Sequence, residues 1–118
     1  MPANEPDFTQ LAELDRLVHE PSRLAILATL ASCQSADFQF LLNTTGLNKG
    51  NLSAHAIKLE QAGYVAVEKG FSGKLPYTRY KLSDAGRDAL LLYQQQLQQM
   101  LSQMDSSTPT LNAGLGLE

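Results

Sequence analysis

The stretch that most constrains the fold is 48–63, which reads Asn-Lys-Gly-Asn-Leu-Ser-Ala-His-Ala-Ile-Lys-Leu-Glu-Gln-Ala-Gly. Leu52, Ala56 and Leu59 are spaced i, i+4 and i+7, which predicts a helix with one narrow buried stripe. Asn48 is a suitable N-cap, and Gly63 can adopt the left-handed conformation that ends many helices. Most of the remaining side chains are short, polar or cationic. Such a helix suits the major groove of DNA.

The residues after this helix predict a β-hairpin. Segments 64–69 and 76–82 are rich in β-prone side chains, and the segment 70–74 between them contains two glycines, which indicates a loop. A further helix is expected to begin at Ser83-Asp84. The order of helix, hairpin with a basic tip, and helix is typical of a winged helix-turn-helix.

Five segments carry a resemblance to a known family: Pro-Ser-Arg-Leu-Ala-Ile-Leu at 21–27, Phe-Leu-Leu at 40–42, Gly-Asn-Leu-Ser-Ala-His at 50–55, and the segments 59–65 and 78–87. Residues from about 14 to 101 resemble the small winged-helix transcriptional regulators of the ArsR/MarR superfamily, in particular the short winged helix DNA-binding domain branch. The resemblance implies a mainly α winged helix-turn-helix with a small β-hairpin, and DNA binding. It also matches Ser53 and His55 to a Ser-x-His pair near the middle of the recognition helix, the name used here for 48–63.

Three helices are expected before the recognition helix. The first spans 8–19, with Thr9 as a cap, and the second begins at Pro21, with Leu24, Ile26, Leu27 and Leu30 as its core face. Segment 33–36 is expected to be a loop. Asp37 is expected to cap the third helix, 38–45, in which Phe40 and Leu41 are predicted core residues.

The last helix is predicted from 84 to about 104. Gly86, Leu90, Tyr93, Leu97, Met100 and Met104 form a heptad-like stripe along it. Because a single winged helix cannot cover the far half of this stripe, we expect a homodimer held partly by this helix, with the first helix as its companion. The alternative is a core helix that frays beyond Gln95. Residues 1–104 are thus one domain, and 105–118 is expected to be a disordered tail.

The charge of the chain is unevenly distributed. The net charge is −3, yet residues 48–81 hold six basic and two acidic side chains, whereas the rest holds three basic and ten acidic ones. A cationic region that coincides with the recognition helix and hairpin favours contact with phosphates. Random scatter of a few lysines is the alternative explanation.

The predicted partner is double-stranded DNA. The predicted contact residues are Asn48, Lys49, Asn51, Ser53, Ala54, His55, Lys58, Lys69, Lys74 and Arg79. His55 has an equally weighted alternative, a hydrogen bond to a neighbouring side chain. Arg23 is expected either to reach a phosphate or to pair with an acid such as Asp15. We expect a homodimeric repressor on an inverted repeat, although activation is also compatible with the sequence.

Other functions have less support. The longest apolar runs are five residues, too short to span a membrane, and no secretory signal is expected. One cysteine, Cys33, allows no intrachain disulfide and fits a reducing cytoplasm. The chain has no zinc-ligand spacing, no catalytic motif and no cofactor motif. A winged helix that docks an acidic protein instead of DNA is the competing hypothesis. A small-molecule effector near Phe8, Tyr93 and Met100 is conceivable, but core packing is the simpler role for these residues.

Overall fold

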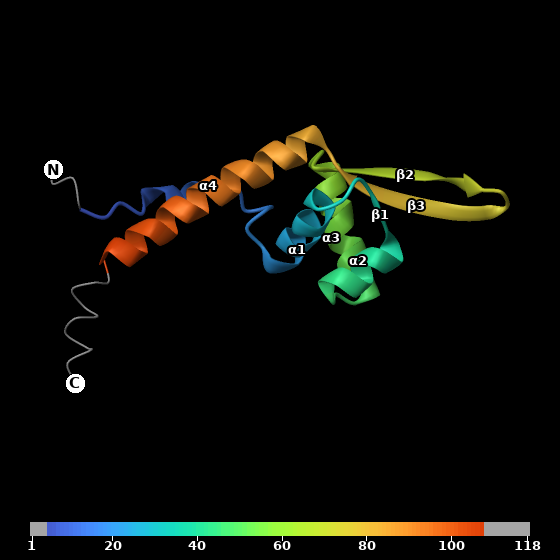
Figure 1. Ribbon diagram of the computed structural model, residues 1–118, viewed down its shortest axis with the longest axis horizontal. Helices are drawn as coiled ribbons and strands as arrows, with labels where there is room; N and C mark the ends of the chain where they lie inside the picture. Colours follow the sequence, from blue (N-terminus) through green and yellow to red (C-terminus); the bar gives the residue numbers. More distant parts are fainter. Residues whose placement is uncertain (1–4, 108–118) are drawn as a thin grey trace. The chain divides into compact units, whose positions relative to one another are not determined.

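The structure is a computed structural model that describes residues 5–107 (Figure 1). In chain order the elements are a short 3-10 helix η1 (Thr9–Glu13), α1 (Pro21–Ala31), β1 (Ala36–Asp37), α2 (Phe38–Thr45), α3 (Lys49–Gln61), β2 (Val65–Ser72), β3 (Leu75–Leu82) and α4 (Asp84–Ser107). The chain forms two compact units, one spanning Asp15–Leu91 and the other combining residues up to Leu14 with those from Leu92. The elements confirm the predicted winged helix-turn-helix with a long C-terminal helix.

Local capping signals place the helices where the sequence predicted them. The Asp37 carboxylate accepts a hydrogen bond from the Phe40 N–H, and the Asn48 side chain accepts one from the Asn51 N–H, both at 2.8 Å. The Glu20 carboxylate does the same for Arg23 at 2.7 Å, just before Pro21 begins α1. Each cap satisfies an N–H group that the helix itself cannot pair.

The core of the Asp15–Leu91 unit lies where α1, α2 and α3 meet. Its buried side chains include Ile26, Leu27 and Leu30 of α1, Leu41 of α2, and Leu52, Ala56 and Leu59 of α3. The predicted stripe of the recognition helix is therefore the stripe that packs. The prediction that Phe40 is a core residue is wrong, because Phe40 is 49% exposed. In this eight-residue helix Leu41 occupies the core side, and the neighbouring position faces away from it.

The sheet has three strands in the order β1-β3-β2, all antiparallel. β1 pairs Ala36 with Tyr80 and Asp37 with Arg79. The prediction that Ala36 lies in a loop is wrong. A two-residue strand has no alternation to detect, and it forms here because the buried Ala36 lies beside β3.

The hairpin is longer than predicted. The paired strands run from Val65 opposite Leu82 to Ser72 opposite Leu75, so only Gly73 and Lys74 form the turn. Gly73 has a φ of +66°, as the first position of a tight two-residue turn of the II′ class requires. Gly70, predicted to lie in the loop, is a strand residue. A Cβ atom there would lie 2.6 Å from the Tyr77 hydroxyl, so the glycine makes room for the ring on the opposite strand.

The predicted helix 8–19 is wrong. Only η1 forms, and Leu14 is extended, with φ −59° and ψ 142°. The Asp15 carboxylate then accepts hydrogen bonds from the N–H groups of Leu17 and Val18, which favours a turn over a helix. Thr9 does not cap η1; instead its N–H and hydroxyl both donate to the Asp7 carboxylate.

α4 begins at a junction organised by Ser83. Its hydroxyl donates to the Gly63 carbonyl and accepts from the Gly86 N–H at 3.0 Å. Gly86 packs so closely on the Tyr64 carbonyl that a side chain would overlap it. Gly63, with φ +80°, lies just beyond the end of α3. The junction therefore joins the end of α3 to the first turn of α4.

α4 continues to Ser107, three residues past the predicted end, and 108–118 of the predicted tail lie outside the described residues. Leu90, Tyr93 and Met100 of the predicted stripe are buried, whereas Met104 is 44% exposed. The buried Tyr93 and Met100 agree with core packing. No helix within residues 5–107 is long and apolar enough to cross a membrane.

Replacing Gly86 with alanine should destabilise the protein by about 3 kcal/mol or more, because the new methyl group meets backbone that cannot move aside cheaply. Urea unfolding followed by circular dichroism measures the effect. The matched control is Gly50→Ala, also in a helix, whose methyl group would lie 3.6 Å from the Asn48 side-chain oxygen. That control should be neutral or stabilise by up to about 1 kcal/mol. Equal stability of the two variants would contradict the close approach.

Replacing Tyr64 with phenylalanine should remove the 2.6 Å hydrogen bond from its hydroxyl to Asp15 and cost about 1 kcal/mol. This hydrogen bond, aided by burial, raises the pKa of Tyr64 to about 12. Because the unfolded pKa is about 10, the contact stabilises fully below pH 10 and is lost as the pH rises towards 12. Ultraviolet titration of tyrosinate should show the last-ionising tyrosine missing from the variant. An unchanged titration would argue against the contact.

Candidate nucleic-acid interface

The outward side of α3 is exposed over its whole length. Gly50, Ala54, Ile57 and Gln61, spaced i, i+4, i+7 and i+11, form the line most remote from the buried stripe, and all four are exposed. Small side chains at the centre of this line allow close approach to another surface. Ile57 is 49% exposed and was not among the predicted contact residues. Its position off the stripe was the signal that could have identified it.

Polar residues flank this central line on both sides. By helical spacing, Asn51 and Lys58 lie along one flank, and Lys49 and Ser53 along the other; all four are exposed. Asn48 is exposed too, but its side-chain oxygen is engaged as the cap of α3. Donors on both flanks and small or apolar groups between them match the mixture of polar edges and thymine methyl groups in a major groove.

His55 lies towards α1 rather than on the outward line. Its Nδ1 is 3.2 Å from Nη1 of Arg23, so it makes the neighbour contact that was one of the two predicted roles. A guanidinium can only donate, so Nδ1 accepts and the imidazole proton resides on Nε2. Arg23 also donates to the carbonyls of Leu17, at 2.6 Å, and Arg16. It therefore ties the 15–20 turn to α3, and the predicted pairing of Arg23 with Asp15 is not what forms.

The two faces of the hairpin differ in what they present. Val67, Lys69 and Tyr80 face α3, and with Ser53, Ile57 and Glu60 they line an open groove of about 490 Å³. Strand alternation places Glu68, Tyr77 and Arg79 on the opposite face. There the Arg79 guanidinium stacks 4.4 Å from the centre of the Tyr77 ring, and Glu68 is its register partner.

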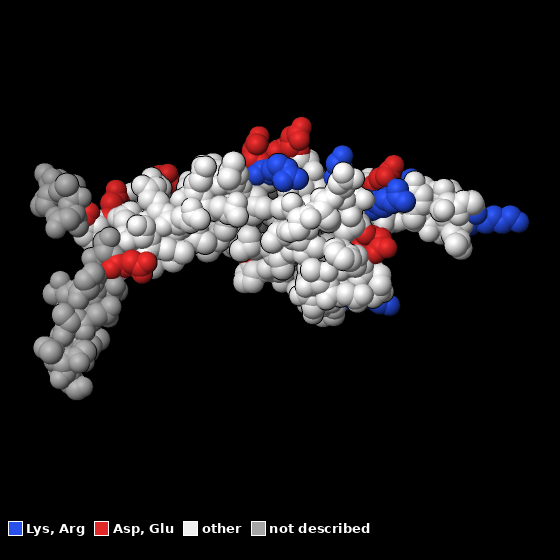
Figure 2. Space-filling model, in the orientation of Figure 1, with Lys and Arg blue, Asp and Glu red and all other residues white. Residues whose placement is uncertain are grey.

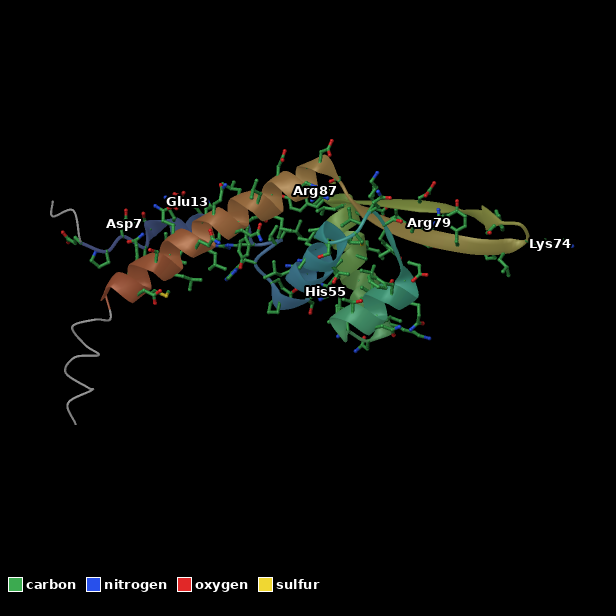
Figure 3. All side chains as sticks on the ribbon, in the orientation of Figure 1. Asp7, Glu13, His55, Lys74, Arg79 and Arg87 are labelled. Carbon is green, nitrogen blue, oxygen red and sulfur yellow. The ribbon has the colours of Figure 1, made fainter. Side chains whose placement is uncertain are left out.

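The predicted contact residues are therefore only partly brought together. Of these residues, Ser53 and Lys69 line the groove between α3 and the hairpin, whereas the others on α3 lie outside it. Lys74 projects from the far end of the hairpin, and Arg79 lies along its side (Figure 3). Because Lys69 and Arg79 are on opposite faces, a single flat surface would meet only one of them.

Basic and acidic side chains are less clearly separated on the surface of the molecule than they are along the sequence. On the face drawn in Figure 2 the end of the hairpin carries a basic side chain alone, whereas basic and acidic side chains lie side by side nearer its base. Glu60 lines the groove between α3 and the hairpin. Burial, and then the charge of Glu60, raise the pKa of Tyr80 above its usual value. For an anionic ligand, the cations with the fewest acidic neighbours are therefore Lys74 at the turn and Lys58 on the flank of α3 away from Glu60.

No group of three or more His, Cys, Asp or Glu side chains within the described residues could hold a metal ion. Cys33 is half-buried, and its thiol donates to the Thr29 carbonyl at 3.4 Å. The described part of the molecule thus presents an exposed helix and hairpin rather than a metal centre.

Comparison with known proteins agrees with this geometry. The chain is 34% identical to an uncharacterized protein of Methanocaldococcus jannaschii over 71 residues, which is 60% of this chain and 77% of that protein. A transcriptional regulator homologue from Pyrococcus horikoshii OT3 superimposes with a TM-score of 0.78 and 25% identity, covering 83% of this chain and 99% of that one. MarR from E. coli, in its apo form, superimposes with a TM-score of 0.61 and 16% identity, covering 91% and 86%.

A family model for the winged helix DNA-binding domain matches residues 22–101, which include the helix-turn-helix, the hairpin and most of α4. The protein from Pyrococcus horikoshii is described as a transcriptional regulator homologue, and a similar structure from Silicibacter pomeroyi as a transcriptional regulator of the MarR family. The chain therefore belongs to the winged helix DNA-binding domain family, with the fold of the MarR-like transcriptional regulators.

Proposed function

We propose that this winged-helix regulator is a homodimeric repressor that recognises an inverted repeat in duplex DNA by inserting α3 into the major groove. The observation that carries the proposal is the exposed outward side of α3, with Ala54 and Ile57 at its centre and donors on both flanks. A helix used only as a structural support would be expected to carry longer charged side chains on that side.

The proposed roles follow from position. Asn51 lies near the start of α3, where its amide can pair with both polar atoms of an adenine edge. Ala54 and Ile57 contact thymine methyl groups, while Lys49, Ser53 and Lys58 on the flanks meet phosphates or base edges. Asn48 orients the start of the helix. His55 is proposed to act through Nε2, because its Nδ1 faces Arg23.

The hairpin supplies affinity with little specificity from hydrogen bonds. Lys69 lies on the face turned towards α3, and we expect it to meet the DNA backbone beside the recognition helix. Lys74 reaches furthest from the domain, and Arg79 on the other face adds positive potential that Glu68 partly offsets. These cations are expected to act mainly by displacing counterions from the phosphates.

The dimer is proposed from α4. Leu91, Leu92 and Leu101 are 53%, 55% and 49% exposed, so α4 keeps uncovered apolar surface on more than one side. A second copy of this chain would cover such a surface and place two α3 helices about 34 Å apart, in successive major grooves. Because the predicted first helix forms only as η1, its proposed share in the dimer contact is smaller than the sequence indicated.

Selection of genomic DNA fragments with the purified protein tests the proposal. The recovered fragments should share an inverted repeat with half-site centres about 10–11 base pairs apart. The variant Asn51→Ala should relax the preference at one position of each half-site, at a cost of about 1–3 kcal/mol. Recovered fragments with the same sequence content as bulk DNA would contradict the proposal of sequence-specific regulation. Retention of the protein on an acidic protein partner under the same conditions would support the competing interaction module.

The variant Lys74→Ala should weaken binding to all duplexes by a similar factor and lower the slope of log affinity against log salt by about 1. The reason is that Lys74 lies at the turn, where it meets phosphate rather than base edges. Fluorescence anisotropy over a range of salt concentrations measures the slope. Arg87→Ala, which removes an exposed cation in the first turn of α4, is the matched control and should leave the slope unchanged. A change of sequence preference at constant slope would contradict this role.

A further inference from the structure

The end of the hairpin is apolar as well as basic. Phe71 is 72% exposed and Leu75 is 73% exposed, more than any other large apolar side chains among the described residues. Neither is explained by the core, by the groove beside α3 or by the exposed side of α4. A solvent-exposed hairpin end more often carries small or charged residues. One large apolar side chain on each side of the Gly73-Lys74 turn therefore indicates a surface that contacts a partner.

Their arrangement is that of a wedge. The register pairs Phe71 with Pro76 and Ser72 with Leu75, so strand alternation places Phe71 and Leu75 on opposite faces of the ribbon. Phe71 shares the face of Val67 and Lys69, which is the face turned towards α3. The end of the hairpin thus has one apolar side chain on each face, with Lys74 at the turn between them.

The hairpin is long enough to reach a second groove. β2 has eight residues, about 26 Å at 3.3 Å per residue, and begins four residues after the end of α3. A major groove and the adjacent minor groove are about half a helical turn apart, roughly 17 Å. With α3 in a major groove, the end of the hairpin would therefore reach the neighbouring minor groove. Figure 1 shows β2 and β3 extending beyond α1, α2 and α3.

We propose that the hairpin end is an apolar wedge for the minor groove: Phe71 enters between base pairs at a flexible pyrimidine–purine step, while Lys74 contacts the flanking phosphates. The inference rests on the proposed DNA binding and adds a second source of sequence preference to it. DNA is the occupant because a cation lies between the two apolar groups and another, Lys69, lies on the same ribbon.

The physical consequence is recognition without base hydrogen bonds. Inserting an apolar side chain unstacks a base step, and this costs least at steps such as TA, whereas A-tracts resist deformation. Phe71 would therefore favour deformable sequence at a fixed distance from the bases that α3 contacts. The donors on α3 would then recognise base edges, and the hairpin end would independently recognise the deformability of the DNA.

The test compares two duplexes of equal length, charge and base composition. One is alternating dA-dT, with many TA steps, and the other is a dA tract paired with dT. The wild-type protein should bind the alternating duplex about ten-fold more tightly at equal salt. A 2-aminopurine placed at a TA step should brighten on binding, because its fluorescence rises when stacking is lost.

Variants separate the wedge from other causes. Phe71→Ala should reduce the ten-fold preference to about two-fold or less and abolish the fluorescence rise, whereas Phe71→Leu should retain most of both. Because Phe71 is so exposed, both variants should fold normally. Phe40→Ala, which removes another exposed Phe far from the hairpin end, should leave the preference intact, and Lys74→Ala should weaken both duplexes equally.

The outcomes are distinguishable. Wild-type binding to both duplexes with no preference, or a preference that survives in Phe71→Ala, would overturn the wedge and leave the proposed DNA binding standing. Failure to bind either duplex at low salt would overturn the proposed function itself, and the wedge with it. A Phe71→Ala variant that keeps the DNA preference but loses mass in sedimentation equilibrium would assign the hairpin end to contact between two copies.

Discussion

The packing of one side of α3 sets the conditions for everything else in this domain. Leu52, Ala56 and Leu59 are buried, and α3 contacts α1, α2 and β2 through them and their neighbours. Burial of a leucine side chain is worth about 1.5–3 kcal/mol, so two leucines and an alanine are enough to hold a helix that is otherwise polar. Because the stripe is narrow, more than half of the circumference stays free. A broader stripe would have stabilised the helix further and left less of it available to a ligand.

Signals carried by a few adjacent residues were predictable from the sequence. Asp37, Asn48 and Pro21 mark helix starts, since capping and the fixed φ of proline act locally. Where the outcome depended on distant residues, the sequence misled. Gly70 looks like a loop residue until Tyr77, seven positions away, is seen to lie across it. Asp15 interrupts a helical pattern with hydrogen bonds that no periodicity can reveal.

In the candidate interface, too, the features set by local spacing could be predicted from the sequence, and those set by distant residues could not. Helical spacing correctly separated the buried residues of α3 from the exposed ones, so most of the proposed contacts on that helix could be predicted. Counting charges along the chain could not show that Lys69 and Arg79 lie on opposite faces, or that Glu60 lines the groove. Nor could composition identify Phe71 and Leu75 as the most exposed apolar groups, because their surroundings depend on where the turn falls. The faces of a ribbon follow from register, and register was set by the two-residue turn.

The Ser83 hydroxyl has a consequence for motion. It bonds to the carbonyl of Gly63, beside the end of α3, and to the N–H of Gly86, in the first turn of α4, while Gly86 rests directly against Tyr64. Two helices separated by an entire hairpin are thereby fastened at one point, without a compressible side chain between them. A tilt of the first turn of α4 should therefore also move the C-terminal end of α3, because no flexible side chain lies between them. We therefore expect the C-terminal end of α3 and the first turn of α4 to move together.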